Sequence, residues 1–252
     1  MNKLSAVIIT YNEEKNLERT LLSLENIADE IVIVDSFSID KTEEIALKFK
    51  KVKFYKNEWK GYSEQKNYAN TLATHSLIFS IDADEVVSKE LEKSILKIKN
   101  EAKPGEAYVV KRLTNYCGKW IRHSGWYPDK KLRIWFKEEG RWEGELHEKV
   151  VFEKKPVIKE LEGDLYHYSF HTISQHLQQI DKFTDIGALE SVKKGKKSSL
   201  FKAMYKSVWK FFRDYFVKLG FLDGYYGFVV CYLSSMATFV KYIKIKELTK
   251  RA

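Results

Sequence analysis

The sequence predicts an α/β fold in which a mostly parallel sheet is flanked by helices. Short apolar, β-branched runs without charges alternate with segments of helical spacing through the N-terminal half, as in a doubly wound sheet. Polar residues directly follow several of these runs, where ligands of such sheets bind. The 252 residues are also enough for one large core plus an appendage.

Four buried strands are predicted in the N-terminal half, with a helix after each of the first three. The strands are residues 4–9, 30–34, 51–55 and 77–81. The first helix, residues 12–24, carries Leu17, Leu21 and Leu24 on one face. A turn at 38–42 leads into a helix through residue 49, and residues 63–73 form the next.

The second half begins with a helix at 89–100 and a strand at 106–113. Residues 115–136 are loop-like and aromatic, and short strands are expected at 132–136 and 149–152. Helices follow at 174–193, 200–219 and 225–243, with a basic hinge at 193–197. We therefore divide the chain into an α/β domain, residues 1–173, and a helical, basic region, residues 174–252.

Composition limits the cellular setting. The two cysteines, Cys117 and Cys231, show no metal-ligand spacing, and the N-terminus lacks a signal-peptide pattern, so we expect a cytoplasmic protein. The net charge of +9 is uneven. From Ser191 onward there are roughly 14 basic and 3 acidic residues, which suits an anionic membrane surface or nucleic acid.

Asp82 and Asp84 directly follow the apolar run at 77–81. Two acids at a strand end are costly unless a cation or a hydrogen-bonding ligand meets them, although a solvated acidic turn has the same pattern. Carboxylate oxygens suit Mg²⁺ or Mn²⁺, which commonly bridge a carboxylate and a substrate diphosphate.

Three motifs in order resemble the family-2 glycosyltransferases of the GT-A fold. They are I-I-T-Y-N-E-E at 8–14, I-V-D-S-F-S-I-D-K-T at 33–42, and D-A-D at 82–84. The resemblance covers roughly residues 3–170 and implies a nucleotide-sugar donor and inversion at the anomeric carbon. G-W-Y-P-D-K-K-L-R at 125–133, L-H-E at 146–148 and H-Y-S at 167–169 resemble a narrower branch, the lipopolysaccharide core heptose β-1,4-glucosyltransferases. That branch implies UDP-glucose as donor.

The resemblance also implies roles for the donor site. The residues that would bind the nucleotide sugar are Thr10, Tyr11, Glu13, Asp35, Lys66, Asn67, Asp82 and Arg133. Asp84 would hold the metal, helped by Asp82 and by His167 or His147 as a further ligand. Simpler roles stay open: Thr10 and Asp35 could cap the helices that follow them, Lys66 could be an exposed helix charge, and each histidine could be structural.

An inverting transfer needs a general base to deprotonate the acceptor hydroxyl. Of the acids near residues 143–148, Glu148 is our choice because it belongs to the L-H-E motif, and Asp129 is the second candidate. Glu148 could instead be a salt-bridged loop acid.

The predicted helix at 200–219 has the composition of an interfacial helix on an anionic membrane. Its aromatic face carries Phe201, Tyr205, Val208, Trp209, Phe212 and Phe216. Lysines lie nearby, and the next apolar stretch, about 16 residues, is short for a membrane span. We expect peripheral attachment to the inner membrane face and a lipid-linked saccharide acceptor; a span, a packed hairpin or a homo-oligomer contact are the alternatives.

Three competing functions remain open. A polyprenyl-phosphate sugar synthase shares the N-terminal motifs, but its phosphate acceptor needs no general base. A nucleic-acid-binding module would explain the basic tail, but no readout motif accompanies the charge, so we expect no nucleic-acid partner. A non-catalytic GT-A scaffold is disfavoured by the intact Asp82 and Asp84.

Overall fold

The computed structural model describes residues 1–144 and 148–251. The chain forms two compact units, each built from two segments. The first comprises Met1–Arg112 and Asp129–His167, and the second comprises Leu113–Pro128 and Tyr168–Ala252. The single boundary predicted at residue 173 is simpler than this division, because residues 113–128 join the C-terminal helices.

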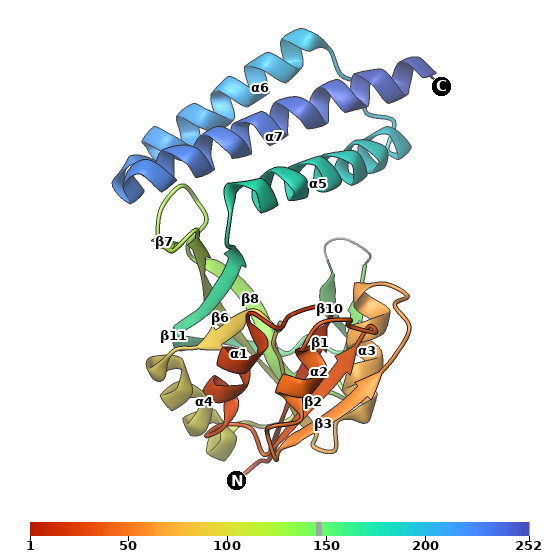
Figure 1. Ribbon diagram of the computed structural model, residues 1–252, viewed down its shortest axis with the longest axis vertical. Helices are drawn as coiled ribbons and strands as arrows, with labels where there is room; N and C mark the ends of the chain where they lie inside the picture. The colour runs from red at the N-terminus through yellow and green to blue at the C-terminus, as the bar shows by residue number, and fades with distance from the viewer. Residues whose placement is uncertain (145–147, 252) are drawn as a thin grey trace. The chain divides into compact units, whose positions relative to one another are not determined.

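The N-terminal strands form the parallel half of the main sheet (Figure 1). They are β1 (Leu4–Thr10), β2 (Glu30–Asp35), β3 (Val52–Lys56) and β4 (Leu77–Ser80), in the order β3-β2-β1-β4. Every residue of β2 is buried, as the uncharged β-branched runs predict. All four predicted strands are therefore confirmed to within a residue or two.

The other half of the sheet makes it mixed rather than mostly parallel. Its strands are β8 (Asp129–Phe136), β6 (Glu106–Tyr116), β11 (Val157–Phe170) and β5 (Glu85–Val87), continuing from β4 in that order. β8 runs antiparallel to both β4 and β6. No helix lies between β6 and β8 in the chain, and antiparallel neighbours need no crossover helix. A short strand, β7 (Lys119–Ile121), also pairs with β6.

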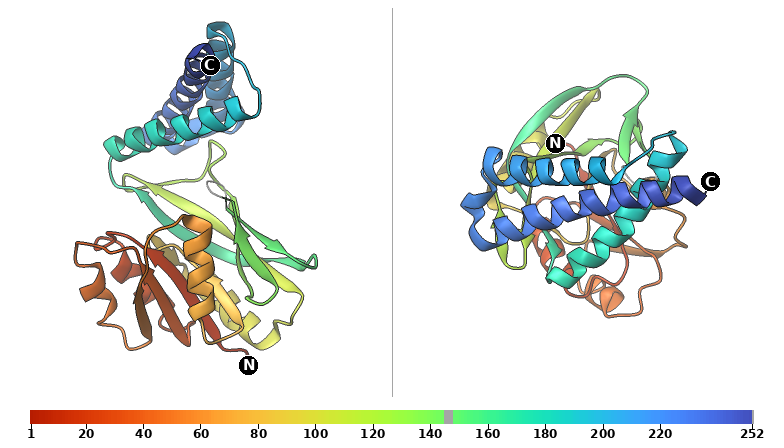
Figure 2. Two further views of the ribbon diagram at one scale, coloured as in Figure 1. Left: turned by 90° about the vertical axis from the view of Figure 1, so that its right-hand side faces the viewer. Right: turned by 90° about the horizontal axis from the view of Figure 1, so that it is seen from above.

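Alternate residues of the strands pack on opposite faces of the sheet. Ile31 and Ile33 of β2 join the core under α1 (Leu17–Leu24), α2 (Thr42–Ala46) and α4 (Lys89–Glu101). Val32 and Val34 join a second core under α3 (Tyr62–Leu72) (Figure 2). A small separate sheet, β9 (Gly140–Glu143) with β10 (Lys149–Phe152), packs on the α3 side through Trp142. The predicted α/β class is thus confirmed.

The second unit is built on three helices, α5 (Ile173–Lys193), α6 (Leu200–Phe212) and α7 (Gly224–Arg251). Thr172 and Gln175 form a capping box where α5 begins. α7 packs against both α5 and α6: the hydroxyls of Ser207 and Ser235 lie 2.9 Å apart, and Lys244 pairs with Asp181 at 2.8 Å. α7 extends well beyond the predicted end at residue 243.

An aromatic cluster joins the two segments of this second unit. Tyr116 packs edge-on against Trp126 and lies 5.4 Å from Phe170, ring centre to ring centre. Its hydroxyl is 2.9 Å from Nδ1 of His176 on α5. Burial lowers the pKa of His176 to about 4, so this histidine is neutral and structural.

Within the described residues, one helical stretch is long and apolar enough to cross a membrane, by length and composition only. It covers Gly220–Lys250, 31 residues with a mean hydropathy of 1.4 in its best window. The same stretch packs along α5 and α6, so its apolar composition also serves contacts inside the unit.

Candidate functional site

The polar ends of β1, β2 and β4 meet at one edge of the sheet. These strands are parallel, and Thr10 is the register partner of Asp35. The N–H of Ile81 still pairs with the carbonyl of Val7 on β1, so Asp82 leaves the sheet beside the same edge. This arrangement brings three of the predicted site segments together, as the parallel topology requires.

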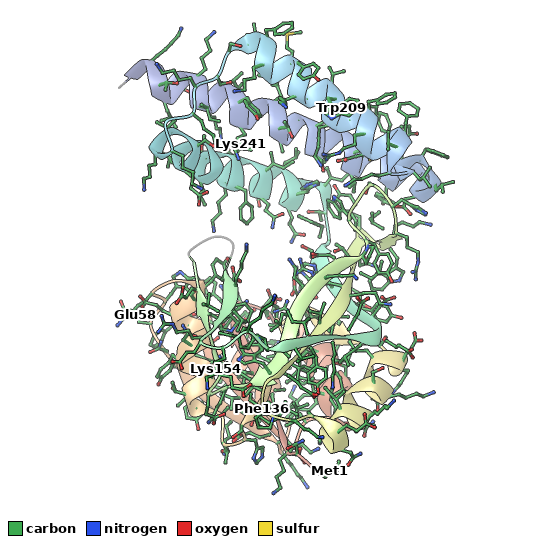
Figure 3. The ribbon with its side chains drawn as sticks, turned by 180° about the vertical axis from the view of Figure 1, so that it is seen from behind. Met1, Glu58, Phe136, Lys154, Trp209 and Lys241 are labelled. Atoms are coloured by element: carbon green, nitrogen blue, oxygen red, sulfur yellow. The ribbon has the colours of Figure 1, made fainter. Side chains whose placement is uncertain are left out.

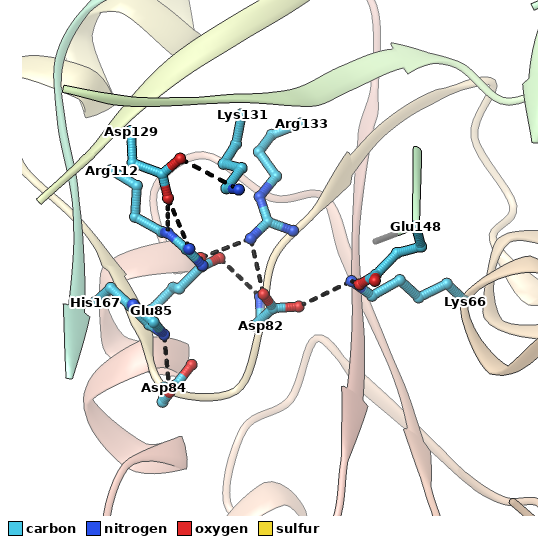
Figure 4. A network of polar contacts seen from close by, with 10 residues as sticks. All are labelled: Lys66, Asp82, Asp84, Glu85, Arg112, Asp129, Lys131, Arg133, Glu148 and His167. Carbon is cyan, nitrogen blue, oxygen red and sulfur yellow. Dashed lines mark hydrogen bonds and ion pairs between the residues drawn. The ribbon is translucent and has the colours of Figure 1, made fainter. Parts of the chain in front are cut away.

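Seven side chains of alternating charge extend from this edge across the antiparallel strands (Figure 4). In order they are Asp129, Arg112, Glu85, Arg133, Asp82, Lys66 and Glu148. We call them the charge chain. The two candidates for the general base therefore lie at its opposite ends.

The middle of the charge chain has the shortest contacts. Arg133 donates from one nitrogen to Glu85 at 2.6 Å and to Asp82 at 2.7 Å. Arg112 reaches Glu85 at 3.3 Å and Asp129 at 2.7 Å. The Glu85 side chain is fully buried and that of Arg133 is 4% exposed, so each charge depends on its partners.

Lys66 connects this middle part to Glu148. Its ammonium lies 2.9 Å from Glu148 and 3.3 Å from Asp82. The Lys66 side chain is buried and lies over the ring of Trp142 at 4.6 Å, so it is not an exposed helix charge. Although burial opposes ionisation, Arg133 and Lys66 hold the pKa of Asp82 well below its usual range.

Asp84 points to a different partner from Asp82. Nε2 of His167 on β11 lies 3.2 Å from Asp84, while Nδ1 of the same ring is buried without a hydrogen-bond partner. A carboxylate suits Mn²⁺ and Mg²⁺, and Mg²⁺ is commonly bound by one or two carboxylates plus substrate phosphates. Across residues 1–144 and 148–251, no group of three His, Cys, Asp or Glu side chains could hold a metal alone. The pair fits a metal that completes its coordination with a diphosphate and water.

The predicted nucleotide-binding residues lie around the end of β1. Thr10 is buried with its hydroxyl oxygen unpartnered, whereas the Tyr11 side chain is exposed. Burial, with a smaller contribution from the nearby Asp84, raises the pKa of Glu13 to about 7 despite a hydrogen bond from Asn16 that lowers it. A buried hydroxyl without a partner and a carboxyl that tends to stay neutral are groups that a ligand could satisfy.

Asp35 and Asn67 have structural partners in this arrangement. Asp35 is fully buried and accepts from the N–H of Ser38 at 2.8 Å and from its hydroxyl at 2.5 Å. It therefore holds the turn after β2 rather than the start of α2. Asn67 pairs with both backbone groups of Trp142, at 2.8 and 2.9 Å, and so ties α3 to β9.

The two predicted bases differ in their surroundings. Asp129 accepts two hydrogen bonds from Arg112, at 2.7 and 3.0 Å, and lies 3.2 Å from Lys131. Glu148 touches Lys66 through one oxygen, Oε1, and its side chain is 20% exposed. The predicted residues Leu146 and His147 lie outside the described residues.

Sequence reasoning missed Glu85 and Arg112 as members of the site. Glu85 is the third acid after β4, and Arg112 is a charge near the end of the alternating strand β6. The available signal was Arg112 itself, because a charged residue inside a strand with neighbours on both sides needs a partner. Its partner Glu85 lies 27 residues away, and residue spacing alone does not reveal such a pair.

The chain belongs to glycosyl transferase family 2, because its residues 5–159 match the sequence model of that family. A glycosyltransferase of Rickettsia bellii is 34% identical over 258 residues, covering 98% of this chain and 87% of the relative. The lipopolysaccharide core biosynthesis glycosyltransferase LpsC of Rhizobium meliloti is 28% identical over 250 residues, covering 97% and 92%. Among solved structures, S. aureus TarS 1-349 in complex with UDP is 16% identical with a TM-score of 0.48, covering 99% and 91%.

Proposed function

We propose that this glycosyltransferase moves glucose from UDP-glucose to a saccharide acceptor of lipopolysaccharide core or a related cell-envelope glycan, with inversion and with Mg²⁺ or Mn²⁺. The observation that carries the proposal is the meeting of two groups at one sheet edge: the Asp84–His167 pair and the Asp82–Lys66–Glu148 cluster. The similarity to LpsC, a lipopolysaccharide core biosynthesis glycosyltransferase, supports the envelope glycan.

The donor would bind across the ends of β1, β2 and β4. Thr10, Tyr11, Glu13 and Asp35 would bind the nucleoside, as the family resemblance implies. Asp84 and His167 would hold the cation. A cation held there would supply positive charge to offset the negative charge of the leaving diphosphate. Lys66 adds a positive charge on the side of Asp82 and Glu148.

Glu148 is the proposed base. One of its oxygens is held by Lys66, which orients the carboxylate, and the side chain is partly open to solvent, where an acceptor hydroxyl can reach it. Asp129 is the weaker choice because Arg112 and Lys131 already hold both of its oxygens. Glu148 would take the proton from the acceptor hydroxyl as that oxygen attacks the anomeric carbon.

The acceptor is proposed to be lipid-linked, with the enzyme in the cytoplasm and peripheral on an anionic membrane. Six large side chains of the second unit, all on or just after α6, are exposed to solvent: Phe201, Tyr205, Val208, Trp209, Phe212 and Phe216. Figure 3 shows the side chains of α6, with Trp209 labelled. Lysines 202, 206 and 210 interleave with them, and this combination suits insertion among anionic headgroups.

The test is a panel of UDP-, GDP-, CMP- and ADP-linked sugars, followed by the release of free nucleotide with and without Mg²⁺ or Mn²⁺. We expect metal-dependent release from UDP-glucose, lost in Asp84→Asn, and a product of inverted anomeric configuration by NMR. Release from a different donor would change the sugar but keep the activity. If no nucleotide is released and calorimetry detects no binding of UDP with metal, the chain is a non-catalytic scaffold.

A further inference from the structure

We propose that Glu85 is a positioning residue for the donor site, acting through Asp82 and Arg133. The inference rests on the proposed function, because it concerns how tightly the donor nucleotide is held. Neither the three motifs nor the family assignment gives Glu85 a role.

Glu85 closes the turn that carries Asp82 and Asp84. Its carboxylate oxygen Oε2 accepts the N–H of Asp82 at 3.0 Å, and its own N–H donates to the carbonyl of Asp82 at 3.0 Å. Glu85 also begins β5, where it is the register partner of His167 on β11. One residue thus fixes the turn of the acidic motif and aligns it with the histidine that pairs with Asp84.

The second oxygen of Glu85 directs Arg133 toward Asp82. Oε1 accepts from Arg133 at 2.6 Å and from Arg112 at 3.3 Å, and the same Arg133 nitrogen donates to Asp82 at 2.7 Å (Figure 4). The Arg133 side chain is almost completely buried. Through this shared nitrogen, Arg133 joins Glu85 to Asp82.

A neutral side chain at position 85 would change this balance. Glu85→Gln keeps nearly the same shape but leaves Arg112 and Arg133 with Asp129 and Asp82 as their remaining acids. The amide has a single acceptor oxygen, so it can accept from Arg133 or from the Asp82 N–H but not from both, and that acceptor is uncharged. If Glu85 acts through Asp82, its loss should weaken donor binding only while Asp82 is an ionised carboxylate.

The experiment is a double-mutant cycle on binding of UDP with Mn²⁺, measured by calorimetry on the full chain. The proteins are the wild type, Glu85→Gln, Asp82→Asn, the double variant, and Glu44→Gln as a control on the exposed side of α2. We expect Glu85→Gln to weaken UDP binding about tenfold or more, and the double variant to bind no more than about twofold worse than Asp82→Asn. The control should bind as the wild type does.

Independent losses would overturn the inference: if the double variant loses the product of the two single effects, or if Glu85→Gln binds as the wild type, Glu85 does not act through Asp82. Should Glu85→Gln fail to fold, Arg133→Lys replaces it, because lysine keeps the charge but its ammonium ends one bond short of the guanidinium nitrogen that contacts both acids. The same weakening and the same non-additivity are then expected, and wild-type affinity of Arg133→Lys would refute the proposal. A wild type that binds no nucleotide would instead refute the proposed function, and this inference with it.

Discussion

Lys66 stands between the proposed base and the acidic motif. Its ammonium lies 2.9 Å from Glu148 and 3.3 Å from Asp82, so one cation separates two carboxylates that come from elements far apart in the sequence. Removing this charge would leave the two acids facing each other with less compensation. The contact would therefore couple the proposed base to the proposed donor site.

Lys66→Met should lower kcat/KM by about 30-fold or more, since losing one partner of a buried charge pair typically costs about 2–5 kcal/mol. Lys66→Arg, which keeps the charge, should lose less. Initial rates of transfer at varied donor concentration check this. Lys60→Met, at an exposed position before α3, is the matched control, and an unchanged rate in Lys66→Met would contradict the prediction.

Glu148→Gln should lower kcat by about 10²- to 10⁴-fold, the usual contribution of a general base, while UDP binding is retained. Single-turnover rates and calorimetry separate the two effects. The control is Glu143→Gln, an exposed acid on β9 that pairs with Arg141. Undiminished turnover in Glu148→Gln would favour a phosphate acceptor, as in a polyprenyl-phosphate sugar synthase.

Asp84→Asn and His167→Gln should both weaken the dependence of UDP binding on Mn²⁺, because the two side chains lie 3.2 Å apart and are the proposed metal ligands. The larger loss is expected for Asp84→Asn, since it removes the charged ligand. Titration of Mn²⁺ with UDP, followed by electron paramagnetic resonance, measures it directly. His75→Gln, on the loop before β4, serves as a histidine control, and an unaltered Mn²⁺ titration in both site variants would exclude this pair as the ligands.

Glu13 should make the free protein less stable as the pH rises. Burial raises its pKa from an ordinary 4.5 to about 7, so the unfolded chain releases this proton first and stability falls between about pH 4.5 and pH 7. Glu13→Gln, which cannot ionise, should therefore be more stable than the wild type by about 1–3 kcal/mol at pH 8 and about equal at pH 4.5.

Urea unfolding at the two pH values, with EDTA present, gives the difference for Glu13→Gln. Glu18→Gln, an exposed acid in the first turn of α1, is the control. An advantage of Glu13→Gln that is the same at both pH values would show that packing, not ionisation, is responsible.

Trp209→Ser together with Phe212→Ser should reduce binding to vesicles that contain phosphatidylglycerol by about tenfold or more, because both side chains are exposed on α6 and carry large apolar areas. Co-sedimentation at low and high salt measures the effect. Leu47→Ser, at an exposed apolar position in the first unit, should bind as the wild type does. Equal binding of all variants would remove α6 from the membrane contact.

The sequence was sufficient for the elements whose signals are local. Uncharged apolar runs predicted β1 to β4, and helical spacing predicted α1, α3, α4 and α5. β11 was not predicted because its 14 residues include Lys159, Glu160, Glu162 and Asp164, which break any apolar run. Pairing with β6 and β5 in the sheet stabilises this strand, and such long-range pairing leaves no local pattern in the sequence.

The same limit applies to the site. Asp82, Asp84, Lys66, Arg133, His167 and both base candidates were named from motifs or from the family resemblance, and the structure places all of them in the pairs described above. Which residue pairs with which depends on contacts between positions separated in the sequence, such as Arg133 with Glu85, 48 residues away, and Lys66 with Glu148, 82 residues away. Motif reading identified the residues, but only the tertiary fold supplies the pairing.

The two-segment construction of the C-terminal unit limits how this chain can be recombined with its relatives. Tyr116 and Trp126 come from residues 113–128, yet they surround His176 of α5. A chimera that carries only residues 174–252 on another transferase would lack Tyr116 and Trp126, so His176 of α5 would lose its aromatic contacts. Chimeras should therefore exchange residues 113–128 together with residues 168–252, because the two segments form one structural unit.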